Sequence, residues 1–104
     1  MNSISMLDLK PYFEKLSPNE LVLDVRTDQE FAEGHVPNAR HLPFELVINH
    51  ADELKKYEQV YVYCRSGRRS HTACVMLESQ GLKNLTCVDE GGMPDWEEAG
   101  FPVE

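Results

Sequence analysis

One short segment gathers the residues that could perform chemistry. It consists of Cys64, Arg65, Ser66, Gly67, Arg68, Arg69 and Ser70. The segment follows a β-prone run at residues 60–63 and precedes a helical pattern that we expect to begin near Ser70. A loop that turns from a strand into a helix can point its backbone N–H groups inward, and the helix N-terminus adds the positive end of its dipole. Gly67 permits the unusual backbone angles that such a cup needs.

Each of these features favours an anion at the centre of the cup, where Cys64 lies. A thiol pKa of about 8.5 can fall to roughly 3.5–7.5 at a helix N-terminus beside cationic side chains. We therefore predict that Cys64 is a thiolate at neutral pH and that the cup can hold a persulfide or an oxyanion. The alternative is a structural cysteine at a strand end, but three arginines in a buried turn would be costly without an anion.

The charge distribution agrees with a local anion site. Residues 59–77 contain three arginines and no acidic residue, although the chain has a net charge of −8. Removing those three positive charges leaves −11 on the remainder. This balance argues against a nucleic-acid or anionic-membrane partner.

No apolar run approaches the length of a membrane span and the start lacks a signal peptide's apolar stretch, so we expect a cytoplasmic protein.

The other cysteines and histidines do not show the spacing of a metal site. Cys64, Cys74 and Cys87 are odd in number and lack a C-x-x-C pair, which disfavours a disulfide scaffold or a zinc site. We expect Cys74 and Cys87 to be buried and inert. Three histidines lie far apart in the sequence and outside the other motifs, namely His41, His50 and His71. Only His71 is close to the loop, and we expect no metal and no cofactor.

Strand-like runs alternate with helix-like segments, which predicts an α/β fold with a mostly parallel sheet. The length fits one domain, residues 1–104. The expected strands are residues 21–25, 60–63 and 85–88, with a further short strand near residues 40–42.

The helix ends are readable. Ser5 to Asp8 and Thr27 to Glu30 have the spacing of capping boxes, and Gly34 can end the second of these helices. The other expected helices run from Asn49 or His50 to about Tyr57, from Ser70 to Gln80, and from the turn at Pro94 to Gly100.

Four segments resemble, in order, the motifs of the rhodanese-like domains. They are Asp24-Val25-Arg26, then residues 30–39 from Glu30-Phe31 through Gly34-His35-Val36-Pro37 to Ala39, then the loop 64–70, then Gly91-Gly92-Met93 with Trp96, Gly100 and Pro102. Asn38 stands where the family usually has glycine. The matches span about four-fifths of the chain, from Leu21 to Pro102.

The resemblance implies a three-layer sandwich with a central, mainly parallel five-stranded sheet and helices on both faces. It also implies a two-step sulfur transfer, in which Cys64 takes a sulfur atom from a donor such as thiosulfate and passes it to cyanide, a thiol or a sulfur-carrier protein. Arg65, Arg68 and Arg69 would hold the sulfonate, and the N–H groups of the loop would hold the persulfide. In the family the position of Arg69 often braces the fold instead. We expect a monomer.

The other motif residues are expected to be structural. Asp24 would anchor a neighbouring loop or form a hydrogen bond near the site, and Arg26 would pair with Glu30 or another carboxylate. His35 would brace the turn at Gly34, and Trp96 would lie in the core.

Two other functions stay open. Cysteine-dependent phosphatases and arsenate reductases use the same cup, but with a C-x5-R pattern; here four residues separate Cys64 from Arg69, and Tyr63 precedes the cysteine where histidine is usual. A non-catalytic binding module is the second alternative, although modules of this kind commonly lack the cysteine. Among donors, the cationic loop favours thiosulfate over 3-mercaptopyruvate.

Overall fold

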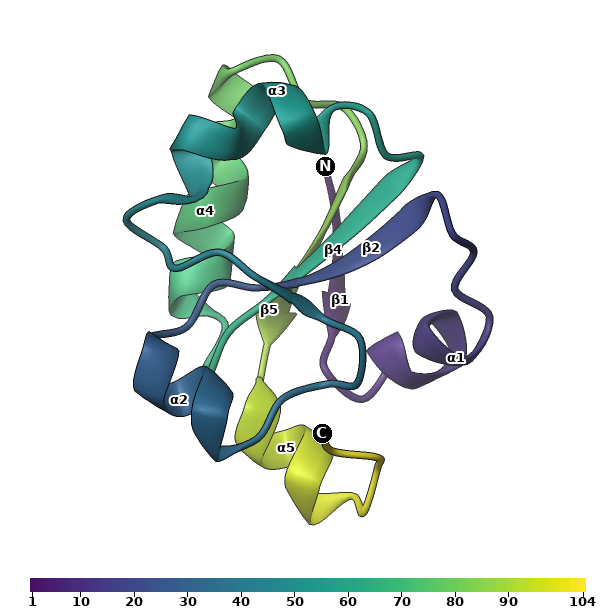
Figure 1. Cartoon of the computed structure of the whole chain (residues 1–104). Helices are drawn as coiled ribbons and strands as arrows, with labels where there is room; N and C mark the ends of the chain where they lie inside the picture. The colour runs from purple at the N-terminus through teal and green to yellow at the C-terminus, as the bar shows by residue number, and fades with distance from the viewer.

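The expected sheet is present and has five strands in the order β1-β5-β4-β2-β3, all paired in parallel. The computed structural model describes residues 1–104 and places helices on both sides of this sheet (Figure 1). The α/β fold class is thereby confirmed. The strands are β1 (Asn2–Ser5), β2 (Glu20–Asp24), β3 (Arg40–His41), β4 (Gln59–Tyr63) and β5 (Leu85–Glu90). The helices are α1 (Leu9–Glu14), α2 (Asp28–Glu33), the 3₁₀ helix η1 (Val47–His50), α3 (Ala51–Leu54), α4 (Arg68–Ser79) and α5 (Met93–Glu98).

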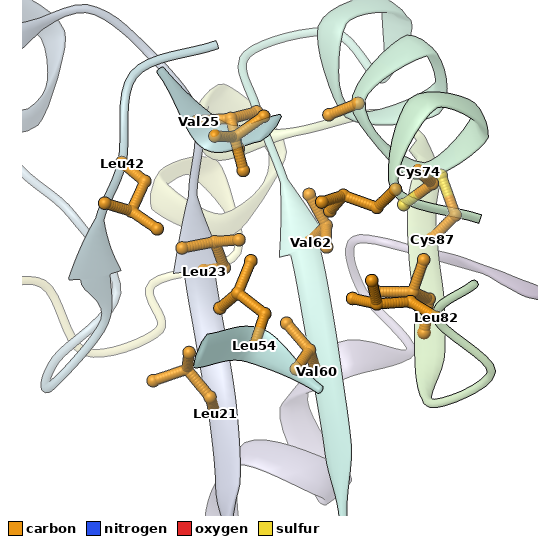
Figure 2. Close-up of a cluster of buried hydrophobic side chains, with 14 of the residues drawn as sticks. Leu21, Leu23, Val25, Leu42, Leu54, Val60, Val62, Cys74, Leu82 and Cys87 are labelled. Carbon is orange, nitrogen blue, oxygen red and sulfur yellow. The ribbon is translucent and has the colours of Figure 1, made fainter. Parts of the chain in front are cut away.

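One face of the sheet packs against α3 and α4. Alternation along β2 and β4 sends Leu21, Leu23, Val60 and Val62 to this face, because successive strand residues point to opposite sides. Figure 2 shows these side chains meeting Leu54 of α3. Cys64 continues the alternation of β4 and belongs to the same cluster. The alternation of side chains along β4 therefore directs the sulfur towards α4.

The opposite face packs against α1 and α5. Its cluster includes Leu9 of α1, Tyr61 and Tyr63 of β4, and Met93 and Trp96 of α5. Trp96 has no exposed surface, which confirms its expected place in the core. No helix exceeds the 12 residues of α4, and none has the length and apolar character needed to cross a membrane.

Two helix ends follow the sequence prediction closely. Thr27 caps α2 through a complete capping box with Glu30, and Gly34 is its C-cap residue. Pro94 lies in the first turn of α5, as expected.

Other boundaries differ from the prediction. The strand β1 was not predicted, because its sequence Asn-Ser-Ile-Ser is polar and lies at an exposed edge of the sheet. The helix expected after Ser5 begins only at Leu9: Ser5 ends β1, and its hydroxyl accepts the Asp8 N–H at 3.1 Å in a non-helical turn.

The remaining differences concern α3 and α4. His50 precedes α3 without a capping side-chain bond, and the helix ends at Leu54 instead of Tyr57. Helix α4 begins at Arg68, two residues earlier than predicted, because Gly67 serves as its N-cap residue in a left-handed conformation with φ 97°. Ser70 lies inside the first turn, where its hydroxyl donates to the carbonyl oxygens of Gly67 and Val88.

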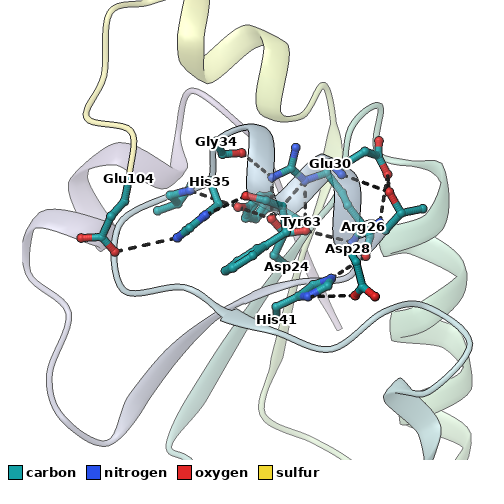
Figure 3. A network of polar contacts seen from close by, with 12 residues as sticks. Asp24, Arg26, Asp28, Glu30, Gly34, His35, His41, Tyr63 and Glu104 are labelled. Atoms are coloured by element: carbon teal, nitrogen blue, oxygen red, sulfur yellow. Dashed lines mark hydrogen bonds and ion pairs between the residues drawn. The ribbon is translucent and has the colours of Figure 1, made fainter.

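A buried polar network stabilises the end of β2 beside the loop (Figure 3). Asp24 is completely buried and accepts hydrogen bonds from the Arg26 guanidinium at 2.7 Å and the Tyr63 hydroxyl at 2.6 Å. The same hydroxyl accepts the Val36 N–H at 3.1 Å. Arg26 also donates to the Gly34 carbonyl at 2.7 Å. Burial and the Asp24 carboxylate raise the pKa of Tyr63, so its hydroxyl stays a donor. The network thus ties the end of α2 to the sheet.

The network predicts a stability loss in Tyr63→Phe. The substitution leaves the buried Val36 N–H without a partner and removes one of the donors to Asp24 Oδ2, which costs about 1–3 kcal/mol of unfolding free energy. Urea denaturation measures this loss. Tyr12→Phe is the matched control, since Tyr12 is 48% exposed, and it should leave stability unchanged. Equal stability of the two variants would contradict the assigned role of the hydroxyl.

Candidate active site

The segment predicted to do chemistry lies at the carboxyl end of β4, the central strand of the sheet. Parallel sheets commonly bind ligands at this edge. The loop makes its turn at Gly67, whose backbone carries φ 97° and contacts β5 so closely that a Cβ atom there would overlap the Asp89 carbonyl. No other residue type fits this position without displacing β5.

Backbone N–H groups converge on the sulfur as predicted. The Gly67 N–H lies 3.1 Å from Cys64 Sγ, and the Ser70 N–H lies 3.4 Å from it. The Ser70 hydroxyl oxygen is 3.5 Å from the sulfur. Both N–H groups belong to the start of α4, so the cup and the helix N-terminus are one structure.

These contacts set the charge state of the thiol. Burial raises the pKa of Cys64, but the Ser70 side chain and the N–H groups of Ser70, Gly67 and Ser66 lower it by more, leaving a pKa below the ordinary value. The hydroxyl proton of Ser70 has a closer acceptor in the Val88 carbonyl, at 2.7 Å. The amides are therefore the donors on which a sulfur anion depends.

The sulfur lies at the bottom of the cup. Cys64 has no exposed surface in this conformation and packs within the apolar cluster on the α4 side of the sheet. Arg65, Ser66 and Arg68 of the same loop, by contrast, are exposed. The inward-facing amides agree with the prediction, whereas direct access to the sulfur from solvent is absent.

A second turn, between β5 and α5, packs against the backbone of the loop. The Met93 N–H donates to the Cys64 carbonyl at 3.0 Å. Gly92 packs against the backbone of the loop so tightly that a Cβ atom would overlap the carbonyls of Cys64 and Arg65. Sequence reasoning recognised the Gly91-Gly92-Met93 motif but gave it no role. Its contact with Cys64 depends on packing between segments that are far apart in the chain.

The three arginines of the loop have different roles. The guanidinium groups of Arg65 and Arg68 form no ion pair and no hydrogen bond, and both side chains are exposed. Arg69 instead forms a two-pronged ion pair with Glu30 of α2, at 2.8 Å and 3.0 Å. This pairing lowers the pKa of Glu30 to about 2. The bracing role that the family resemblance allowed for Arg69 is the one its contacts support, although its charge still acts on Cys64.

The remaining predicted residues are structural. Arg26 pairs with a carboxylate as expected, and its partner is Asp24 instead of Glu30. His35 braces the turn as predicted: its Nδ1 lies 2.9 Å from the Phe31 carbonyl, and its ring stacks on Phe31. Cys74 and Cys87 are buried.

Comparison with known proteins agrees with this geometry. The profile of the rhodanese-like domain family matches residues 8–99. A protein named sulfurtransferase from Allochromatium vinosum is 34% identical over 102 residues, covering 96% of this chain and 94% of its own length. The thiosulfate sulfurtransferase GlpE of Vibrio cholerae is 31% identical over 83 residues, covering 80% of this chain and 77% of its own.

Solved structures agree as well. The crystal structure of a rhodanese-like domain protein from Staphylococcus aureus is 32% identical with a TM-score of 0.81, and the alignment covers 100% of this chain and 99% of that one. A rhodanese-related protein from Thermoplasma volcanium gives the same TM-score of 0.81 at 30% identity. With its motifs in order, its fold reproduced and a cysteine held by the amides of its active loop, the chain belongs to the rhodanese-like domain family.

Proposed function

We propose that this protein transfers a sulfane sulfur from thiosulfate, or a similar anionic donor, to a thiol acceptor through a persulfide on Cys64. The observation that carries the proposal is the pair of N–H groups on Cys64 Sγ. The same loop carries Arg65 and Arg68, whose side chains are exposed and have no carboxylate partner. This arrangement stabilises a sulfur anion and attracts a dianionic donor. Relatives named sulfurtransferases support it.

In the first step, the Cys64 thiolate attacks the outer sulfur of thiosulfate. A new S–S bond forms, the bond from that sulfur to the sulfonate sulfur breaks, and sulfite leaves with the electron pair. Arg65 and Arg68 offset the charge of the donor and of the departing sulfite. The amides of Gly67 and Ser70 remain in place for the persulfide anion, which is the charge-stabilising arrangement that an activated cysteine requires.

In the second step, the thiolate of the acceptor attacks the outer persulfide sulfur. The acceptor leaves as a persulfide, and the Cys64 thiolate returns to its amides. No net proton or electron is needed when both attacking groups are anions, so the site needs no base and no cofactor. Thiols and sulfur-carrier proteins are the proposed acceptors, with the chain acting as a monomer.

The buried sulfur adds a requirement. The cup must open for a donor to reach Cys64, because the residue has no accessible surface. The short loop holds one sulfur atom, which favours sulfur transfer over phosphoryl transfer. Phosphate-ester hydrolysis without sulfur transfer would reverse this assignment.

The first prediction concerns the covalent intermediate. Incubation with thiosulfate should add about 32 Da, one sulfur atom, to the intact protein, and a thiol acceptor should remove it. Cys64→Ser should show neither the adduct nor turnover, while Cys74→Ser should retain both. Full transfer by Cys64→Ser would refute the mechanism.

The second prediction separates Arg68 from Arg69. Arg68→Ala removes a charge-assisted contact with thiosulfate worth about 1.5–3 kcal/mol. The variant should therefore raise the KM for thiosulfate about 10- to 100-fold and leave the stability of the protein unchanged. Arg69→Ala should cost about 1 kcal/mol of unfolding free energy by freeing the partly exposed Glu30. Thiosulfate kinetics and urea denaturation measure the two effects.

The pH dependence of Arg69→Ala gives an internal check. Arg69, with smaller contributions from Thr27, lowers the Glu30 pKa from 4.5 to about 2, so the stabilisation from the ion pair is complete above pH 4.5 and fades as the pH falls towards 2. The stability difference between the parent and Arg69→Ala should therefore narrow in that window. A difference independent of pH would assign the loss to packing instead.

The third prediction concerns the thiolate. Because the pKa of Cys64 is lowered, the pH profile of its alkylation by iodoacetamide should lie at lower pH than that of an unperturbed thiol. The Cys87 thiol and burial raise the pKa of Cys74, so Cys74 should stay unmodified as an internal control. Peptide mass spectrometry locates the adducts. Failure of Cys64 to react at any pH would mean that the cup does not open.

A further inference from the structure

A second group of reactive side chains lies where α4 packs on β5, apart from the cup. His71 on α4 and Cys87 and Asp89 on β5 each offer one ligand atom, and these atoms all lie within 4.8 Å of one another. His71 Nδ1 is 3.3 Å from Asp89 Oδ2. Cys87 is fully buried, the Asp89 side chain is 24% exposed and the His71 side chain is 56% exposed. The group therefore runs from the core to the surface.

Secondary structure explains the convergence and places a further cysteine beside the group. His71 and Cys74 are three residues apart on α4, and Cys87 and Asp89 are two apart on β5, so each pair shares one face of its element. Figure 2 shows the sulfur atoms of Cys74 and Cys87 beside each other. One donor from the helix thus meets two donors from the strand, and Cys74 lies beside Cys87.

We propose that this group is a zinc site, with His71, Cys87 and Asp89 as ligands and a water molecule completing the tetrahedron. Imidazole, thiolate and carboxylate together form the mixed donor set that this borderline-soft ion accepts. Sequence reasoning did not find it, because the ligands have no C-x-x-C spacing and meet only across the helix–strand contact.

The geometry requires a modest contraction. With bonds of about 2.0–2.3 Å, the donors of a tetrahedral zinc ion lie about 3.3–3.8 Å apart. Atoms now within 4.8 Å must approach by about 1 Å, and the exposed His71 and the partly exposed Asp89 side chains can rotate to do so. Zinc replaces the thiol proton of each cysteine that binds it, and the protons go to solvent.

A zinc ion at this site would stabilise the contact between β5 and the loop that holds Cys64. Asp89 contributes its side chain to the cluster, while its carbonyl packs against Gly67. An ion held by both α4 and β5 fixes these two elements against each other. Since zinc binds only the folded arrangement, it raises the stability of the protein.

The test uses the Cys64→Ser protein, which removes the reactive sulfur as a competing ligand and makes the outcome independent of sulfur transfer. The apo protein is dialysed against zinc, and metal analysis gives the stoichiometry and affinity. Cobalt then replaces zinc, and its absorption spectrum reports tetrahedral geometry and thiolate ligation. We expect one equivalent of zinc, a thiolate-to-cobalt charge-transfer band and a higher melting temperature with zinc.

His71→Ala in the same background decides the proposal, because an exposed side chain can be removed without disturbing the core. Zinc affinity should fall at least about tenfold, the smallest loss typical of even an outer-sphere change. His50→Ala, which removes a histidine paired with Glu53 on α3, is the control and should bind as the parent does. The proposal is overturned by substoichiometric binding, by equal affinity in His71→Ala, or by a cobalt spectrum without thiolate ligation.

Discussion

A sulfur anion can lie inside a protein only where hydrogen-bond donors replace the water it has lost, and this requirement organises the structure around Cys64. The donors are the N–H groups of Gly67 and Ser70, which the first turn of α4 leaves free of partners within the helix. Their convergence needs a left-handed residue at Gly67 and close packing of Gly92 beneath the loop. The anion site is thus built from backbone, and side chains mainly hold that backbone in place.

Charge around the site is divided between folding and binding. Arg69 is held by Glu30, and Arg26 is held by Asp24, so two guanidinium groups stabilise the carboxyl edge of the sheet. Arg65 and Arg68 have no such partner and remain free for an anionic ligand. The division explains how a chain with a net charge of −8 can present a cationic spot that is not neutralised by its own carboxylates.

Helix α4 connects the two sites described above. Its first turn supplies the amides that face Cys64, and its next turn presents His71 and Cys74 to β5. The strand contributes to both as well, because the Asp89 carbonyl limits the space at Gly67 while its carboxylate faces His71. A change in the contact between α4 and β5 would therefore be transmitted directly to the loop that holds the sulfur.

The sequence alone determined the features that depend on neighbouring residues. Alternating strand and helix patterns predicted the α/β class, the spacing of Thr27 and Glu30 predicted a real capping box, and the loop from Cys64 to Ser70 was identified with its amides facing inward. These features rest on hydrogen bonds within a few residues, so local spacing encodes them. Only the tertiary structure decided that polar β1 completes the sheet, that Arg69 pairs with Glu30, that the sulfur is fully buried, and that His71 meets Cys87 and Asp89. Those outcomes depend on which surfaces pack together between segments that are far apart in the sequence. The spacing of residues within one segment does not encode such long-range contacts.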